Sequence, residues 1–171
     1  METTVPVCLA LGNRKVGRVW TFSLPSLLTC PGASAWCKEH CYARRYERFR
    51  VNVRVAYLNN LRLSHEPDVL AAKVLDALPK HAGHVRIHVG GDFYSVPYIE
   101  AWQHICATRP QTQFWAYTRS WMLRDLRQAL EQLRALPNVA LFASCDATMP
   151  DPPKGWRVAW IAPLASGDPW R

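Results

Sequence analysis

The feature that most constrains this 171-residue chain is its alternation of apolar strand patterns with helix patterns. The stretch 85–89, in which Val85, Ile87 and Val89 alternate with polar residues, ends at a Gly-Gly pair, a combination typical of a strand and a turn. Leucines then recur at helical spacing from Leu123 to Leu136. Such alternation predicts a parallel sheet with helices on one or both faces.

The predicted elements form a regular order along one domain, residues 1–171. Two strands are expected within residues 5–25, around a turn at Gly12-Asn13, followed by a loop from 25 to 41. The later helices are predicted at 42–63, 68–78, 97–108 and 123–136, and the later strands at 85–89, 112–118, 139–143 and 158–162. A closed eightfold barrel needs roughly 250 residues. We therefore expect a partial, open (β/α) barrel of about five to six mostly parallel strands, with an N-terminal hairpin.

Composition narrows the class of protein further. Apolar residues make up 49% and charged residues 20%, as in globular proteins with a packed core. No run of apolar residues is long enough to span a membrane, and the first residues lack a secretory signal pattern, so a cytoplasmic protein is expected. The net charge of +8 permits an anionic partner. Six cysteines without an export signal favour metal or redox chemistry over disulfides.

Three cysteines fall close together in the loop after the first predicted strands. Cys30, Cys37 and Cys41 have the spacing C-x6-C-x3-C. Three thiolates suit an iron–sulfur cluster that keeps one iron open to another ligand. Zinc sites more often use two pairs of ligands, although His40 offers a fourth donor here. The alternative without a metal is that these cysteines are small buried apolar residues.

Polar residues follow each of the next predicted strands, at the edge of the sheet where parallel-sheet proteins usually bind ligands. Glycines allow a ligand to approach the backbone, and a carboxylate after them can bind an ammonium group or cap a helix. An arginine in this position binds a carboxylate or lies on the surface at a helix start. These strand-end residues are Gly90, Gly91 and Asp92, then Thr118, Arg119 and Ser120, then Ser144, Cys145 and Asp146.

In this order, the motifs resemble the radical S-adenosylmethionine (SAM) superfamily. More closely, the chain is similar to the phage gene-product-88-like proteins, through the segments FSLPSLLTCPGA, CYA, HVGGDFYS, FWAYTRSW and ASCDA between about residues 20 and 147. The resemblance implies that Cys30, Cys37 and Cys41 hold a [4Fe-4S] cluster. It also implies that the strand-end residues other than Cys145 contact SAM, together with the aromatic Tyr42 beside the last cysteine.

The resemblance implies an enzyme activity as well. An external electron donor reduces the cluster, SAM is cleaved to methionine and a 5′-deoxyadenosyl radical, and the radical takes hydrogen from a substrate. Tyr117 and Cys145 are the candidate catalytic residues near strand ends, although strand alternation points Cys145 away from Ser144 and Asp146. Two alternatives remain: an iron–sulfur or SAM-binding protein without turnover, and a zinc-stabilised nucleic-acid-binding module.

The arginine-rich stretch 44–54 is the sequence feature that bears on the substrate and partners. Arginines interleaved with Tyr46 and Phe49 can contact phosphates and bases, but the interpretation we favour is a solvated helix face with both aromatic residues packed inward. An open barrel of this size does not enclose a substrate alone. A nucleic acid, a peptide or a second subunit in a homodimer would suit its open side. The resemblance places the protein in the cytoplasm of a host cell if a phage encodes it.

Overall fold

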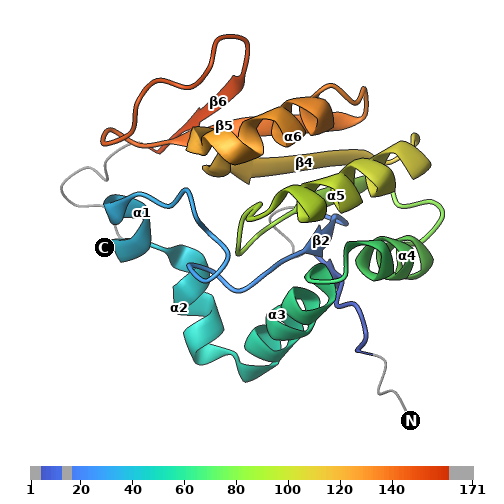
Figure 1. Ribbon diagram of the computed structural model, residues 1–171. Coiled ribbons are helices and arrows are strands. Elements are labelled where there is room, and N and C mark those ends of the chain that lie inside the picture. The colour runs from blue at the N-terminus through green and yellow to red at the C-terminus, as the bar shows by residue number, and fades with distance from the viewer. Residues whose placement is uncertain (1–4, 13–16, 162–171) are drawn as a thin grey trace.

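A computed structural model describes residues 5–12 and 17–161, which form a mixed α/β structure around one six-stranded sheet (Figure 1). The strands lie in chain order and are β1 (Ala10–Leu11), β2 (Trp20–Phe22), β3 (His84–Ile87), β4 (Gln113–Thr118), β5 (Val139–Cys145) and β6 (Arg157–Trp160). β1 and β2 form an antiparallel hairpin, and every later pair is parallel. The sheet is open, because β1 and β6 are its two edges.

The helices divide into a group over the sheet and a group at its carboxyl edge (Figure 1). They are α1 (Ala35–Glu39), α2 (Tyr42–Phe49), α3 (Val51–Ser64), α4 (Pro67–Ala77), α5 (Val96–Thr108), the 3-10 helix η1 (Ser120–Met122) and α6 (Arg124–Arg134). α4, α5 and α6 pack side by side on one face of the sheet. Successive parallel strands that are also neighbours place their crossover helices on the same face, since the crossovers share one hand.

Strand alternation separates the two faces of the sheet. In β5, Leu141 and Ala143 are buried beneath the helices, whereas Phe142 and Ser144 point to the opposite face and are half-buried. The helix-covered side forms the core, around fully buried residues such as Trp102 and Leu130. The opposite face, which we call the uncovered face, remains accessible to solvent.

The predicted helix 42–63 is in fact two helices, because Arg50 adopts an extended conformation between α2 and α3. No proline or glycine marks this break in the sequence. The expectation that Tyr46 and Phe49 pack inward is wrong, since their side chains are 54% and 75% exposed. The reason is that α2 contacts the rest of the protein through a narrow stripe and buries only Ala43.

The segment predicted as the loop 25–41 contains the short helix α1. Ser34 begins it, because its hydroxyl accepts a hydrogen bond from the amide of Cys37. Asn13 of the predicted turn and Ala162 of the last predicted strand lie outside the described residues. Within the described residues, every helix is too short or too polar to cross a membrane.

Candidate functional site

The connection from β2 to α2, residues 23–41, brings three cysteines together at the carboxyl edge of the sheet; we call it the cysteine loop. Cys30 closes a turn through a bond from its amide to the carbonyl of Leu27, and Cys37 lies in α1. Cys41 begins α2, and its sulfur accepts a hydrogen bond from the amide of Arg44. The three thiols are half-buried and lie near enough to influence one another electrostatically.

Burial controls the protonation of these thiols in the metal-free chain. It raises the pKa of Cys30 to about 12, and the carboxylate of Asp92 adds to this effect. Burial also raises the pKa of Cys37, while the guanidinium of Arg119 opposes the rise. Cys30 is therefore a thiol at neutral pH, and any metal that binds there must displace its proton.

Two glycines allow the cysteine loop to pack directly against the strand ends. At Gly32, an added Cβ would overlap the carbonyl of Arg119, which follows β4. Gly91 has a φ of +83°, and a Cβ there would lie 2.7 Å from the hydroxyl of Thr29. The amide of Asp92 donates to the carbonyl of Thr29 at 3.1 Å, which fixes the loop to the end of β3.

The carboxylate of Asp92 joins the ends of β3 and β4. It accepts hydrogen bonds from the amide of Phe93, the hydroxyl of Thr118 and the amide of Arg119. Burial raises its pKa against the opposing effect of these bonds. The hydroxyl of Ser120 donates to the carbonyl of Phe93, so Thr118 and Ser120 also bind protein groups. A carboxylate accepts about four hydrogen bonds, which leaves Asp92 room for one further donor.

A buried ion pair connects β4, β5 and the cysteine loop. Nη1 of Arg119 contacts Oδ2 of Asp146, and the hydroxyl of Ser34 donates to the same oxygen at 2.6 Å. Burial alone would raise the pKa of Asp146, but hydrogen bonds from Ser34, Thr148 and Arg119 hold it well below its usual range. Nη1 of Arg119 also contacts the sulfur of Met149.

One nitrogen of this network makes no hydrogen bond within the described residues. Within the described part of the chain, Nη2 of Arg119 is buried and has no hydrogen-bond partner. The whole Arg119 side chain is only 7% exposed. Since an unpaired buried donor is unfavourable, it marks a place where a ligand could supply the missing acceptor.

The other predicted site residues divide between the two faces. Ser144 lies on the uncovered face, and its carbonyl accepts a bond from the indole of Trp121. Tyr117 is on the same face, 41% exposed, with the guanidinium of Arg86 5.4 Å from its ring centre. Cys145 is fully buried in the core on the helix-covered face, so the structure does not bring it together with Tyr117. Strand alternation places its thiol on the opposite face of the sheet from Ser144 and Tyr117, and its catalytic role stays a prediction.

Tyr42 and His40 flank Cys41 and point to different partners. The hydroxyl of Tyr42 donates to the carbonyl of Val89, directly before the glycine turn. The ring of His40 stacks on Trp36, with ring centres 4.5 Å apart, and its Nδ1 lies 3.0 Å from the carbonyl of that residue. Across residues 5–12 and 17–161, no three His, Cys, Asp or Glu side chains are arranged to hold one metal ion.

Sequence reasoning did not find Ser34, Gly32 and Met149 as parts of this site. The spacing of Ser34 and Cys37, a helix-capping residue and the third position after it, was a usable signal. Gly32 and Met149 gave none, because their roles depend on contacts with Arg119 from a distant strand end.

Together, these features define an open α/β protein whose parallel strands present a three-cysteine loop, a glycine turn and a buried arginine–aspartate pair at one edge. The chain belongs to the Gene product 88 family, which it matches over residues 8–169. It is 35% identical to the Gene 88 protein of Mycobacterium phage L5 over 148 residues, and 35% identical to that of Mycobacterium phage D29 over 150 residues.

Each of these alignments covers 79% of this chain and 60% of the relative. The chain therefore spans less than two thirds of the length of the curated relatives it matches. No solved structure matches it.

The close approach at Gly32 generates the first prediction. Gly32→Ala should destabilise the fold by about 1 to 3 kcal/mol, because the new methyl group meets backbone rather than a movable side chain. Gly83→Ala is the control, since the space around Gly83 is open. Urea unfolding measures both; equal stability of the two variants would contradict the packing described for the cysteine loop.

The second prediction concerns the buried ion pair. Asp146→Asn should lower the free energy of unfolding by about 3 kcal/mol or more, because it leaves the Arg119 guanidinium buried without a counter-charge. Glu131→Gln makes the same chemical change in the half-exposed pair with Arg134, and should cost less than about 1 kcal/mol. If thermal or urea unfolding gave similar losses for both, the Arg119–Asp146 pair would not hold the site together.

Proposed function

We propose that this chain is a minimal radical SAM enzyme built on a partial, open (β/α) barrel. The observation that carries the proposal is that Cys30, Cys37 and Cys41 lie within electrostatic reach of one another, with Cys37 also near Arg119, whose buried Nη2 has no partner within residues 5–12 and 17–161. The order of the strands, with the crossover helices on one face of an open sheet, would suit an incomplete barrel wall. Sites in such folds lie at the carboxyl ends of the strands, where these residues are.

The donor set fits a [4Fe-4S] cluster better than a single metal ion. In such a cluster each thiolate binds a different iron, so three ligands need not meet at one point. A single zinc ion needs four donors at about 2.0 to 2.3 Å, and the zinc alternative would require His40, whose ring stacks on Trp36. Cys30, Cys37 and Cys41 would hold three irons and leave the fourth open.

A cluster held by these cysteines would, when reduced, supply the electron for cleavage of SAM, and so the radical chemistry that removes hydrogen from a substrate. The chain binds and orients the cofactors. Arg119 binds Asp146 through Nη1. Its second terminal nitrogen, Nη2, would pair with the SAM carboxylate. Asp92 would accept the SAM ammonium with its remaining position, and Gly90 and Gly91 allow close approach.

The remaining predicted contacts take supporting roles in this proposal. Tyr42 would border the adenosyl group, and Ser144 would bond its ribose from the uncovered face. Thr118 and Ser120 hold Asp92 and the turn around it in place. Tyr117, exposed on the uncovered face, remains the candidate for relaying a hydrogen atom. An external electron donor would be required, and the host cytoplasm is the proposed location.

The third prediction tests the cofactor and the activity. Protein reconstituted anaerobically with iron and sulfide should be brown, with broad absorption near about 400 nm. After reduction it should convert SAM to 5′-deoxyadenosine, measured by chromatography. Cys37→Ala should abolish both signals, whereas Cys8→Ala, at a cysteine outside the loop, should leave both intact.

The outcomes separate the alternatives. A colourless protein with stoichiometric zinc would reject the proposal in favour of a zinc-stabilised module. A brown protein whose electron paramagnetic resonance signal changes with SAM, but which makes no 5′-deoxyadenosine, would be a cluster- and SAM-binding protein without turnover.

The fourth prediction isolates the role of Arg119. Arg119→Lys keeps a cation beside Asp146 but removes the second guanidinium nitrogen. We expect SAM affinity to fall by about tenfold, with cluster absorbance unchanged. Arg127→Lys is the control, because Arg127 donates to the carbonyl of Trp121 away from the cysteines. Equilibrium dialysis with labelled SAM measures both; unchanged affinity in Arg119→Lys would remove the carboxylate assignment.

A further inference from the structure

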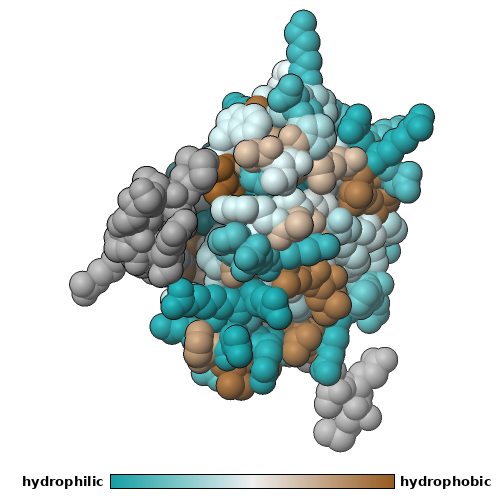
Figure 2. Space-filling model, turned by 90° about the vertical axis from the view of Figure 1, so that its left-hand side faces the viewer, coloured by the Kyte–Doolittle hydropathy of each residue, from teal (hydrophilic) through white to brown (hydrophobic). Residues whose placement is uncertain are grey.

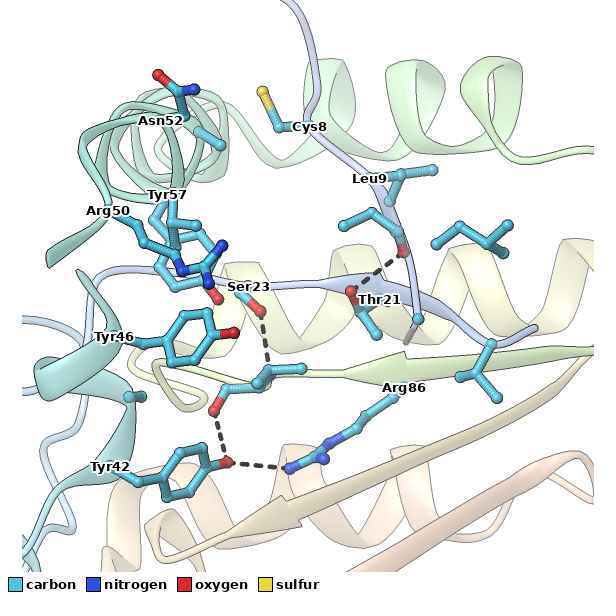
Figure 3. Close-up of a pocket in the computed structure, with 18 of the residues that line it drawn as sticks. Cys8, Leu9, Thr21, Ser23, Tyr42, Tyr46, Arg50, Asn52, Tyr57 and Arg86 are labelled. Atoms are coloured by element: carbon cyan, nitrogen blue, oxygen red, sulfur yellow. Dashed lines mark hydrogen bonds between the residues drawn. The ribbon is translucent and has the colours of Figure 1, made fainter. Parts of the chain in front are cut away.

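A cavity lies on the uncovered face, and none of the three cysteines of the cysteine loop lines it. Its volume is about 670 Å³, within the usual range for small-molecule sites. Figure 3 shows Arg86 and Thr21 on the sheet side of this pocket, and Tyr42, Tyr46 and Arg50 on the helix side. Tyr42 directly follows Cys41, so one end of the pocket adjoins the cysteine loop.

The pocket has a positive lining. Arg50 and Arg86 are among the residues that form it, and none of its lining residues within the described chain is Asp or Glu. The two ion pairs among the described residues, Arg119–Asp146 and Arg134–Glu131, involve neither arginine of the pocket. Within residues 5–12 and 17–161, both guanidinium groups are therefore without a carboxylate partner, and the pocket favours an anion.

Flat rings surround these charges. The guanidinium of Arg50 lies 4.8 Å from the ring centre of Tyr46, and Figure 3 shows it extending between Tyr46 and Tyr57. Nη2 of Arg86 donates to the hydroxyl of Tyr42 at 3.1 Å. The indole of Trp115 belongs to the sheet wall. Aromatic faces beside arginines are suited to stacking a nucleobase while binding its phosphate.

We propose that this pocket binds one nucleotide unit, a base stacked on its rings with a 5′-phosphate on Arg50 and Arg86. SAM carries an ammonium and a sulfonium against one carboxylate, so its net positive charge disfavours this pocket. The nucleotide therefore occupies a different site from the cofactor. That it is the substrate of the hydrogen abstraction rests on the proposed function, whereas the binding itself does not.

The surroundings of the pocket favour a nucleotide within a single strand over a free one. The outer face of α2 is exposed and basic, through Arg44, Arg45 and Arg48. Phe49, 75% exposed, adds an aromatic surface beside them. Figure 2 shows hydrophilic side chains gathered in the lower half of the molecular face that contains α1 and α2, with apolar groups between them. A strand leaving the pocket would meet this surface.

Binding is tested by titration calorimetry on the full chain with 5′-AMP, 5′-UMP, adenosine and inorganic phosphate. Each nucleotide should bind at least about tenfold more tightly than adenosine or phosphate alone. Arg50→Gln and Arg86→Gln should each weaken nucleotide binding by about tenfold. Arg62→Gln, on α3 but outside the pocket, should leave it unchanged. Circular dichroism shows that each variant is folded.

A labelled single-stranded oligonucleotide of about 12 residues identifies the source of the nucleotide. If the strand is the ligand, it binds more tightly than 5′-AMP and 5′-UMP, and its affinity falls with salt. Arg48→Gln then weakens binding of the strand but not of the mononucleotides. Equal affinity for strand and mononucleotide would retain the pocket and reassign its ligand to a free nucleotide. Absence of nucleotide binding by the folded wild-type chain, or equal losses in Arg62→Gln and Arg50→Gln, would overturn the proposal.

The same titration on Cys37→Ala keeps the two proposals distinguishable. None of the three cysteines of the cysteine loop lines the pocket. Nucleotide affinity should therefore be unchanged in this variant, which is expected to lose the cluster. A large loss in Cys37→Ala alone would overturn the independence of the pocket from the cofactor. Cluster formation without nucleotide binding would reject the pocket and leave the enzyme proposal standing.

Discussion

The position of the cysteine loop depends on one buried carboxylate, that of Asp146. Its oxygens accept bonds from Ser34, which begins α1, and from Arg119, which follows β4. The backbone of Arg119 is in turn fixed by Asp92 at the end of β3. Three consecutive parallel strands are thus joined to the helix that contains Cys37 through hydrogen bonds of the buried residues Asp92, Arg119 and Asp146. A loop of this length, with two prolines and one glycine, has little regular structure of its own to hold it there.

A buried pair of this kind is weak evidence for stability, since desolvation offsets much of the attraction. Its stronger consequence is conformational. Arg119 can be desolvated only where Asp146 and Ser34 meet it, so the side chain has one favourable position. Its Nη2, which has no partner among the described residues, is therefore held at a fixed place by a guanidinium that also influences Cys37. Preorganisation of this type lowers the cost of ordering a binding site when the ligand arrives.

The sequence predicted the sheet more fully than the site. Parallel strands and their crossover helices are local patterns, and each of the predicted strands after residue 80 has its counterpart in β3 to β6. The break at Arg50 was missed because it follows from tertiary packing of α2 and α3, and the exposure of Phe49 was missed for the same reason. The strand-end rule found Asp92, Arg119 and Asp146, but not that Arg119 joins the other two, through its amide to Asp92 and through its guanidinium to Asp146. The positive pocket was not predicted, because Arg50 and Arg86 come together only through the β2–β3 crossover.

Tyr42 connects the two candidate sites physically. Its position directly after Cys41 fixes its backbone to the cysteine loop, while its hydroxyl binds both the carbonyl of Val89 and the guanidinium of Arg86. A ligand that drew Arg86 toward its phosphate would compete for that contact. Because α2 buries only Ala43, it can accommodate such a movement of Arg86 without rearranging the core, in keeping with a pocket that binds its ligand whether or not the cluster is present.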